Sequence, residues 1–253
     1  MSFIPMLAIS RREITRILRI WSQTIVPQVL TSVLFIIIFG YSLGSRITDI
    51  AGVSYLEFII PGLLMMAVIM SSYMNTSSSL YFAKWSKMMQ EWLVAPISYW
   101  QVIISLTLAG MFRALLVGFS ILLISLIFTS IQVHSYLILI YFILMNALLF
   151  SFAGIATALW ATNFDRLNVF STFIITPLTY LGGVFYSIKM LPEFLGNIAT
   201  FNPIFYLVDG FRFAFLGVSD VSVVYSILIA LVLTFLFFGL CIHLFRIGYK
   251  FRT

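Results

Sequence analysis

The sequence has few charged residues, one cysteine and two histidines, and each shortage excludes a class of protein. Only 14 Lys or Arg and 8 Asp or Glu stand among 253 residues. A soluble core of this size could not bury 26 Phe, 12 Tyr and 11 Met behind so few charges. Cys241 alone cannot form an intrachain disulfide. His134 and His243 are predicted to lie near opposite faces of the membrane, so they cannot bind the same metal ion. We therefore expect no metal site and no disulfide.

Motifs for nucleotide binding and hydrolysis are also missing. The sequence contains no GxxxxGK[ST] phosphate loop, so the chain cannot bind ATP by that route. It contains no GxSxG motif and no serine beside a plausible histidine base. We predict no catalytic residue on this chain, which is not expected to be an enzyme.

Apolar residues dominate instead. They make up 62% of the sequence, against roughly 45–50% in an ordinary soluble domain, and the mean hydropathy is +1.12. A span needs about 20 apolar residues. The gaps between charged residues thus predict an all-α membrane protein, a single transmembrane domain over residues 1–253. Six spans are expected, at 24–44, 58–79, 105–129, 136–160, 168–187 and 221–245.

The basic residues predict the orientation of the spans. Six spans place both termini on one side, and most Lys and Arg residues fall on that side. By the positive-inside rule, both termini are expected to be cytoplasmic. The net charge of +6 then reflects topology, and no nucleic-acid partner is expected.

Residues 1–21 have an amphipathic pattern. Apolar side chains fall at helical spacing on one face. The basic residues of the segment, several of them on another face, are Arg11, Arg12, Arg16 and Arg19. The pattern favours a helix at the cytoplasmic interface over a basic tail without fixed structure.

A second amphipathic segment, residues 81–95, lies between the second and third predicted spans. Its apolar stripe consists of Trp85, Met88, Met89 and Trp92, with Lys84, Lys87 and Glu91 off the stripe. The spacing predicts a short helix that ends before Pro96. Such a helix can insert into a groove on a soluble partner or anchor the chain at the membrane surface, and spacing alone does not separate the two. Asp165 and Arg166, in another loop, are a minor second contact.

Within the spans, polar groups are few, and no acidic residue lies inside any of them. Arg113 is either a functional intramembrane charge or a snorkelling side chain, with snorkelling favoured. Other polar residues either line a cavity or hydrogen-bond neighbouring helices: Ser72, Asn75, Thr76, Thr179 and Tyr180. Small residues such as Gly110 and Gly154 predict close helix contacts.

The region before the last span is too interrupted to cross a membrane. Asn202 and Pro203 break its apolar run, so residues 188–217 are predicted to form an extracytoplasmic re-entrant hairpin. Asp209 and Arg212 stand three residues apart and are expected to pair.

Three motifs in this chain resemble those of ABC-2 type transporter permeases. They are Asn-Pro-Ile-Phe-Tyr-Leu-Val-Asp-Gly-Phe-Arg at 202–212, Thr-Pro-Leu-Thr-Tyr-Leu-Gly-Gly-Val-Phe-Tyr at 176–186, and Glu-Trp-Leu-Val-Ala-Pro at 91–96. The resemblance as a whole covers nearly the whole chain. Many family members carry an acidic-Arg-Glu-Gly-Thr run before the glutamate, whereas residues 84–90 here read Lys-Trp-Ser-Lys-Met-Met-Gln.

The resemblance implies a half-transporter in the inner membrane of a bacterium. Two copies of the chain would work with two copies of a separate ATPase that holds ATP and Mg, and lipids would surround them; the chain itself would carry no cofactor. Residues 1–21 would be an elbow helix, 81–95 a coupling helix, and 188–217 a pair of re-entrant half-helices. ATPase coupling would then involve Lys84, Trp85, Lys87, Met88, Glu91, Trp92, Asp165 and Arg166.

The expected function is ATP-dependent export of a hydrophobic or amphipathic substrate, such as a drug, a lipid or a glycolipid. The alternative is an ATP-independent channel or carrier. Against it stand the missing intramembrane acids, which coupled carriers usually need.

Overall fold

The structure is a computed structural model that describes residues 3–42, 44, 50, 52–129 and 133–250. Every regular element in these ranges is helical, and an isolated bridge between Ile50 and Val53 is the one extended pairing among them. The all-α prediction is therefore confirmed. Residues 1–2 of the predicted elbow helix and residue 43 of the first predicted span lie outside the described residues.

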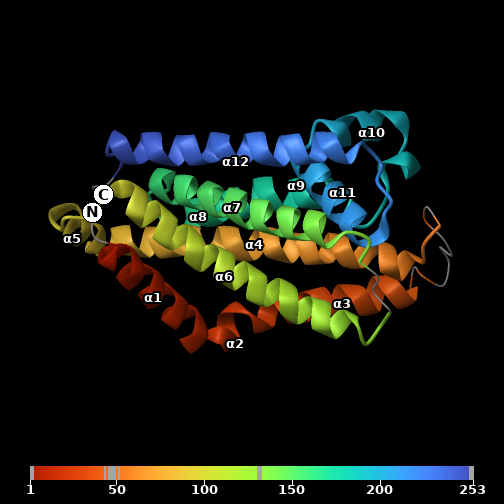
Figure 1. The fold of residues 1–253 in the computed structure, drawn as a ribbon, viewed down its shortest axis with the longest axis horizontal. Coiled ribbons are helices and arrows are strands. Elements are labelled where there is room, and N and C mark those ends of the chain that lie inside the picture. Colours follow the sequence, from red (N-terminus) through yellow and green to blue (C-terminus); the bar gives the residue numbers. More distant parts are fainter. Residues whose placement is uncertain (1–2, 43, 45–49, 51, 130–132, 251–253) are drawn as a thin grey trace.

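The helices form one elongated bundle (Figure 1). Its longer elements are α1 (Ile4–Arg19), α3 (Val26–Ser42), α4 (Tyr55–Trp85), α6 (Tyr99–Ser125), α7 (Tyr136–Trp160) and α12 (Val223–Arg246). Shorter helices are α2 (Trp21–Thr24), α5 (Met88–Val94), α8 (Phe164–Phe170), α9 (Thr176–Tyr180), α10 (Glu193–Thr200) and α11 (Pro203–Leu216). Helix α1 begins and α12 ends at the end of the bundle where α5 lies (Figure 1).

Helix α4 is the centre of the bundle. It packs against α7, α6, α3 and α11, and most of its residues are buried. It begins in a capping box, in which Ser54 accepts from the Glu57 amide and Glu57 accepts from the Ser54 amide. At 31 residues it is roughly 46 Å long, while the hydrocarbon core of a bilayer is only about 30 Å thick. It is therefore longer than a span perpendicular to the membrane needs to be.

Small residues bring α6 and α7 against α4, as their spacing predicts. A Cβ on Gly110 would lie 2.7 Å from Cγ2 of Thr76, and one on Gly154 would lie 2.2 Å from Oγ1 of Thr76. Thr76 also donates to the carbonyl of Ser151 on α7, at 2.9 Å. The backbones approach this closely because no side chain separates them.

Five helical segments of the described residues are long and apolar enough to cross a membrane. They are Trp21–Gly40, Tyr55–Trp85, Tyr99–Ser125, Tyr136–Trp160 and Val223–Arg246. They correspond to five of the six predicted spans. The third begins earlier than predicted, because Ser98 and Gln101 form a capping box before α6.

The fifth predicted span, 168–187, differs from its prediction. Helix α8 passes through a π-helical turn at Ser171–Ile175 into α9, which ends at Tyr180. A turn with Gly183 at a φ of 77° follows, a conformation that glycine adopts without strain. The helical stretch is thus too short to count among the five, and a sixth span stays a prediction.

The predicted hairpin contains two short helices, α10 and α11, joined at Asn202. The Asn202 side chain accepts from the Ile204 amide at 3.0 Å and donates to the Leu178 carbonyl at 2.5 Å. Pro203 occupies the first turn, where a missing amide hydrogen costs nothing. The Asn-Pro pair therefore starts α11 and ties it to α9. Entry of this hairpin into a bilayer stays a prediction.

Asp209 and Arg212 do not form the expected direct ion pair, although their opposite charges lie close enough to attract each other. Among the described residues no ion pair joins them. Arg212 donates to the Gly183 carbonyl and lies over the Phe58 ring, 3.9 Å from its centroid. Asp209 instead accepts from the amides of Asp220 and Val221, at 2.9 and 3.2 Å. The two side chains project to different neighbours, because α11 sits between α4 and the loop before α12.

Candidate functional site

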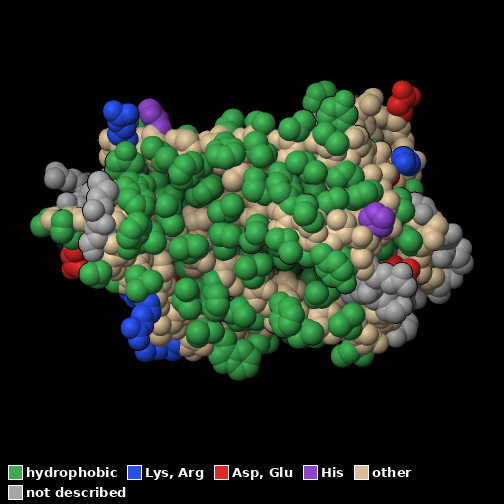
Figure 2. Space-filling model, in the orientation of Figure 1, with side chains coloured by type: hydrophobic (Ala, Val, Ile, Leu, Met, Phe, Trp, Pro, Cys, Tyr) green, Lys and Arg blue, Asp and Glu red, His purple; other side chains and the backbone are tan. Residues whose placement is uncertain are grey.

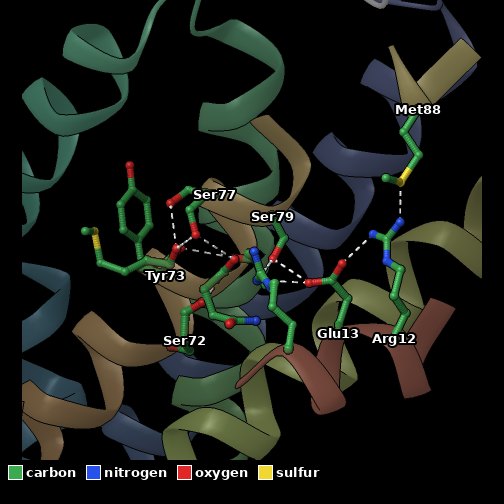
Figure 3. Close-up of polar contacts among 12 residues, drawn as sticks. Arg12, Glu13, Ser72, Tyr73, Ser77, Ser79 and Met88 are labelled. Atoms are coloured by element: carbon green, nitrogen blue, oxygen red, sulfur yellow. Dashed lines mark hydrogen bonds and ion pairs between the residues drawn. The ribbon is translucent and has the colours of Figure 1, made fainter. Parts of the chain in front are cut away.

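A buried carboxylate joins α1 to the end of α4. Glu13 is 2% exposed and accepts from the Ser79 hydroxyl at 2.8 Å. Its two oxygens also form ion pairs with Arg12 and with Arg16, the latter at 2.9 Å. Arg16 in turn donates to Ser79. Figure 3 shows Glu13 between Arg12 and Ser79, with Arg12 continuing to Met88.

Arg12 extends this network to α5. It donates to the Met88 sulfur, and its guanidinium lies 5.4 Å from the centroid of the Trp92 ring. Helix α1 is therefore connected to both α4 and α5 through oppositely charged side chains, Arg12, Glu13 and Arg16, on one of its faces. Its other neighbour is α6, where Ser105 donates to the Met6 carbonyl at 3.0 Å.

The sequence patterns do not single out Glu13. They place the arginines of residues 1–21 on the predicted elbow helix and predict no role for their one acidic neighbour. A signal existed: Glu13 falls at helical spacing between Ile9 and Ile17, which are 6% and 1% exposed. An acid in register with a buried apolar stripe is expected to have a partner.

The predicted helix at 81–95 is two helices. Helix α4 runs to Trp85, and α5 starts at Met88 after Lys87 in the left-handed conformation, at a φ of 62°. The predicted stripe is divided accordingly. Met89 is 2% exposed and Trp92 packs beside it in the core, whereas Trp85 is 65% exposed.

The outward face of this region therefore differs from the predicted stripe. Glu91 and Lys87 are exposed, and Val94 is 89% exposed. With Trp85, these side chains define what we call the α5 face. It lies at one end of the bundle (Figure 1).

Lys84 was expected at the partner contact but lies inside the protein. It is 4% exposed, and its ammonium donates to the carbonyls of Ala158, Leu159 and Ala161 at 3.0, 3.0 and 3.1 Å. These are carbonyls at the C-terminus of α7, which have no partner within the helix. Lys84 therefore caps α7 and fixes it to the end of α4.

Asp165 and Arg166 lie in the first turn of α8, which starts at the same end. Both are exposed, and Asn163 caps the helix by accepting from the Arg166 amide at 2.8 Å. The loop contacts α4 through Tyr81, whose hydroxyl donates to the Thr162 carbonyl at 3.3 Å. The start of α8 therefore lies beside α4.

The polar residues proposed for a cavity lie mostly in helix contacts. Ser72, Asn75 and Thr76 are at most 1% exposed, and Thr179 is fully buried, while Tyr180 is 39% exposed. Arg113 donates to the Thr24 carbonyl at the end of α2, at 2.8 Å. It therefore holds the junction of α2 and α3 rather than simply reaching the surface.

An open cavity of about 640 Å³ lies beside the Glu13 network. Its lining residues include Arg11, Arg12, Arg16, Arg19 and Phe82. A second, almost wholly apolar groove of about 530 Å³ runs between α4, α6, α7 and α11. No group of three or more potential metal ligands occurs within the described ranges.

Comparison with known proteins gives consistent matches. The model for the ABC-2 type transporter family matches residues 6–216. The inner membrane transport permease YadH of Escherichia coli K12 is 42% identical over 251 residues, which cover 99% of this chain and 98% of that protein. The protein of the same name from Shigella flexneri has the same identity and coverage.

Proposed function

This chain belongs to the ABC-2 type transporter family, and we propose that it exports a hydrophobic or amphipathic substrate as one of two permease copies driven by two copies of a separate ATPase. The family and the apolar helices make it a multi-pass transmembrane permease of an ABC transporter.

The connection of the α5 face to the bundle carries the proposal. A permease without a phosphate loop must receive energy through a contact with a nucleotide-binding partner. The α5 face includes an exposed aromatic, Trp85, and an exposed carboxylate, Glu91. Exposed aromatic residues with a charged rim are typical of protein contacts.

The same region can pass a movement onward. A displacement of α5 would act on α1 through the contacts of Arg12 with Met88 and Trp92. It would act on α4 directly, and through Lys84 on the end of α7. In this proposal, ATP binding closes the partner dimer, and α5 distributes that motion to three helices at once.

The apolar groove supports the proposed substrate class. Its walls include Phe112, Phe119 and Phe215, and almost no polar surface faces into it. Such a groove would accept an acyl chain or an aromatic group in preference to a polar solute. Within the family, both termini would be cytoplasmic, and α5 would then face the cytoplasm of a bacterium.

Co-purification tests the proposal. The chain is affinity-tagged in its native host membrane and extracted mildly, and retained subunits are identified. We expect an ABC ATPase whose ATP hydrolysis rises on reconstitution with the permease. Trp85→Ala should reduce retention at least tenfold, and Phe194→Ala, which removes a 74% exposed aromatic from α10 at the other end, should not. A chain that transports without any ATPase would contradict the proposal.

A further inference from the structure

The cavity beside Glu13 has an excess of positive charge. Four arginines line it, and Glu13 is the one carboxylate among its lining residues. Glu13 already pairs with Arg12 and Arg16. Arg11 and Arg19 form no ion pair with any carboxylate that the structure describes. Arg113 on α6 adds a further positive charge close enough to interact with Arg16.

A bound anion would relieve the repulsion among these arginines. Like charges gathered on one helix repel one another, and the single buried carboxylate neutralises only part of them. The Nε of Arg16 is buried and has no hydrogen-bond acceptor. An arginine donor left without an acceptor is costly, so this site favours a ligand with several acceptor oxygens. Phosphate meets that requirement.

The cavity also has an apolar side. Phe82 is 47% exposed and lines it, together with Met88. The adjoining surface of α1 exposes Leu7 and Leu18, at 69% and 51%. Figure 2 shows Lys and Arg side chains gathered over α1 at the edge of a broad hydrophobic surface. This arrangement suits a molecule with a charged head and apolar chains.

We propose that this cavity binds the phosphate headgroup of an anionic phospholipid, with its acyl chains on the exposed apolar side of α1. The guanidinium groups of Arg11 and Arg19 would donate to the phosphate oxygens, while Glu13 holds Arg12 and Arg16 in place. A volume of about 640 Å³ falls within the range of small-ligand sites.

The test uses the full chain in nanodiscs with equal amounts of phosphatidylglycerol and phosphatidylcholine. Native mass spectrometry counts the lipids that stay bound to the protein after it is released from the nanodisc. The variant is Arg11→Gln/Arg19→Gln, which disturbs no ion pair within the described chain. The matched control is Arg166→Gln/Arg246→Gln, which removes two exposed charges at the same end of the bundle.

Wild-type protein should retain phosphatidylglycerol over phosphatidylcholine. Retention should fall roughly fivefold for each arginine removed, and the control should match the wild type. Thr15→Glu, which adds a negative charge to the exposed lining, should also lower retention roughly fivefold and serves if the double variant fails to fold. Equal retention by the double variant and the wild type would overturn the proposal.

A second arm separates a lipid from free phosphate. Inorganic phosphate is added in excess over the lipid before release. We expect it to leave phosphatidylglycerol bound, because the acyl chains contribute through Phe82 and the face of α1. Displacement of the lipid by phosphate alone would show a soluble-anion site and would overturn the assignment to a lipid.

Discussion

Glu13 on α1 accepts a hydrogen bond from Ser79 on α4, at 2.8 Å, across 66 positions of sequence. The contact fixes the predicted elbow helix to the helix that leads directly into α5. Because Arg12 pairs with the same carboxylate and touches both Met88 and Trp92, α1, α4 and α5 form one connected unit. The energetic importance of that unit can be measured.

Glu13→Gln should destabilise the protein by about 2 kcal/mol, because hydrogen bonds to charged groups contribute roughly 1.5–3 kcal/mol. It leaves Arg12 and Arg16 without their carboxylate. Cys241, the chain's one cysteine, is fully buried, so a thiol-reactive dye reports thermal unfolding. The control is Glu193→Gln, an exposed acid on α10. Equal melting temperatures for both variants would contradict the structural role of Glu13.

Lys84→Met should destabilise the protein by roughly 3 kcal/mol, since two buried carbonyls of α7 and that of its C-cap, Ala161, lose their donor. Lys87→Met, which removes an exposed ammonium three residues away, should be close to neutral. The same thiol-dye melting measurement compares them. If Lys87→Met were the more damaging change, the positions of the two lysines would be wrong.

The substitutions Arg212→Asp and Asp209→Arg should not compensate for one another. Arg212→Asp loses the contact with Phe58 and the bond to Gly183, and Asp209→Arg releases the loop at Asp220. Because the partners differ, the charge-swapped double variant should be no more stable than the worse single variant. Yield of folded protein after detergent extraction measures this. A higher yield of folded protein from the double variant than from both single variants would support the direct pairing that the sequence predicts.

Impermeant thiol labelling in intact cells tests the orientation. Lys87→Cys and Lys250→Cys should be protected, because both positions lie at the end of the bundle assigned to the cytoplasm. Phe194→Cys, which is exposed on α10, should be labelled. The buried Cys241 gives little background. Labelling of Lys250→Cys from outside would contradict an arrangement with both termini in the cytoplasm.

Much of the helical architecture could be predicted, because a span is a property of a continuous apolar run. Residues 136–160 were predicted as a span, and α7 has these bounds. The bounds of the helix in the fifth predicted span could not be predicted in the same way. The helix contains a π-helical turn at Ser171–Ile175 and ends before the turn at Gly183, and hydropathy registers neither feature.

The site was harder to predict, because burial is decided by neighbours that are distant in sequence. Lys84 looks like a surface charge until the carbonyl end of α7 is placed beside it. Trp85 and Trp92 share a helical stripe only if the helix continues, and Lys87 interrupts it with a left-handed residue. Spacing located the segment but not which of its aromatic residues faces outward.

Site-specific photo-crosslinking provides the decisive test of ATPase coupling through α5. A benzoylphenylalanine is placed at Gln90, which is exposed on α5, and at Phe194 on α10 as the control. The proteins are expressed in the native host and irradiated in intact membranes, and the adducts are identified by mass spectrometry. We predict that position 90 captures an ABC ATPase subunit and that position 194 does not. A position 90 that captures only lipid, while the permease transports normally, would contradict the coupling role of α5.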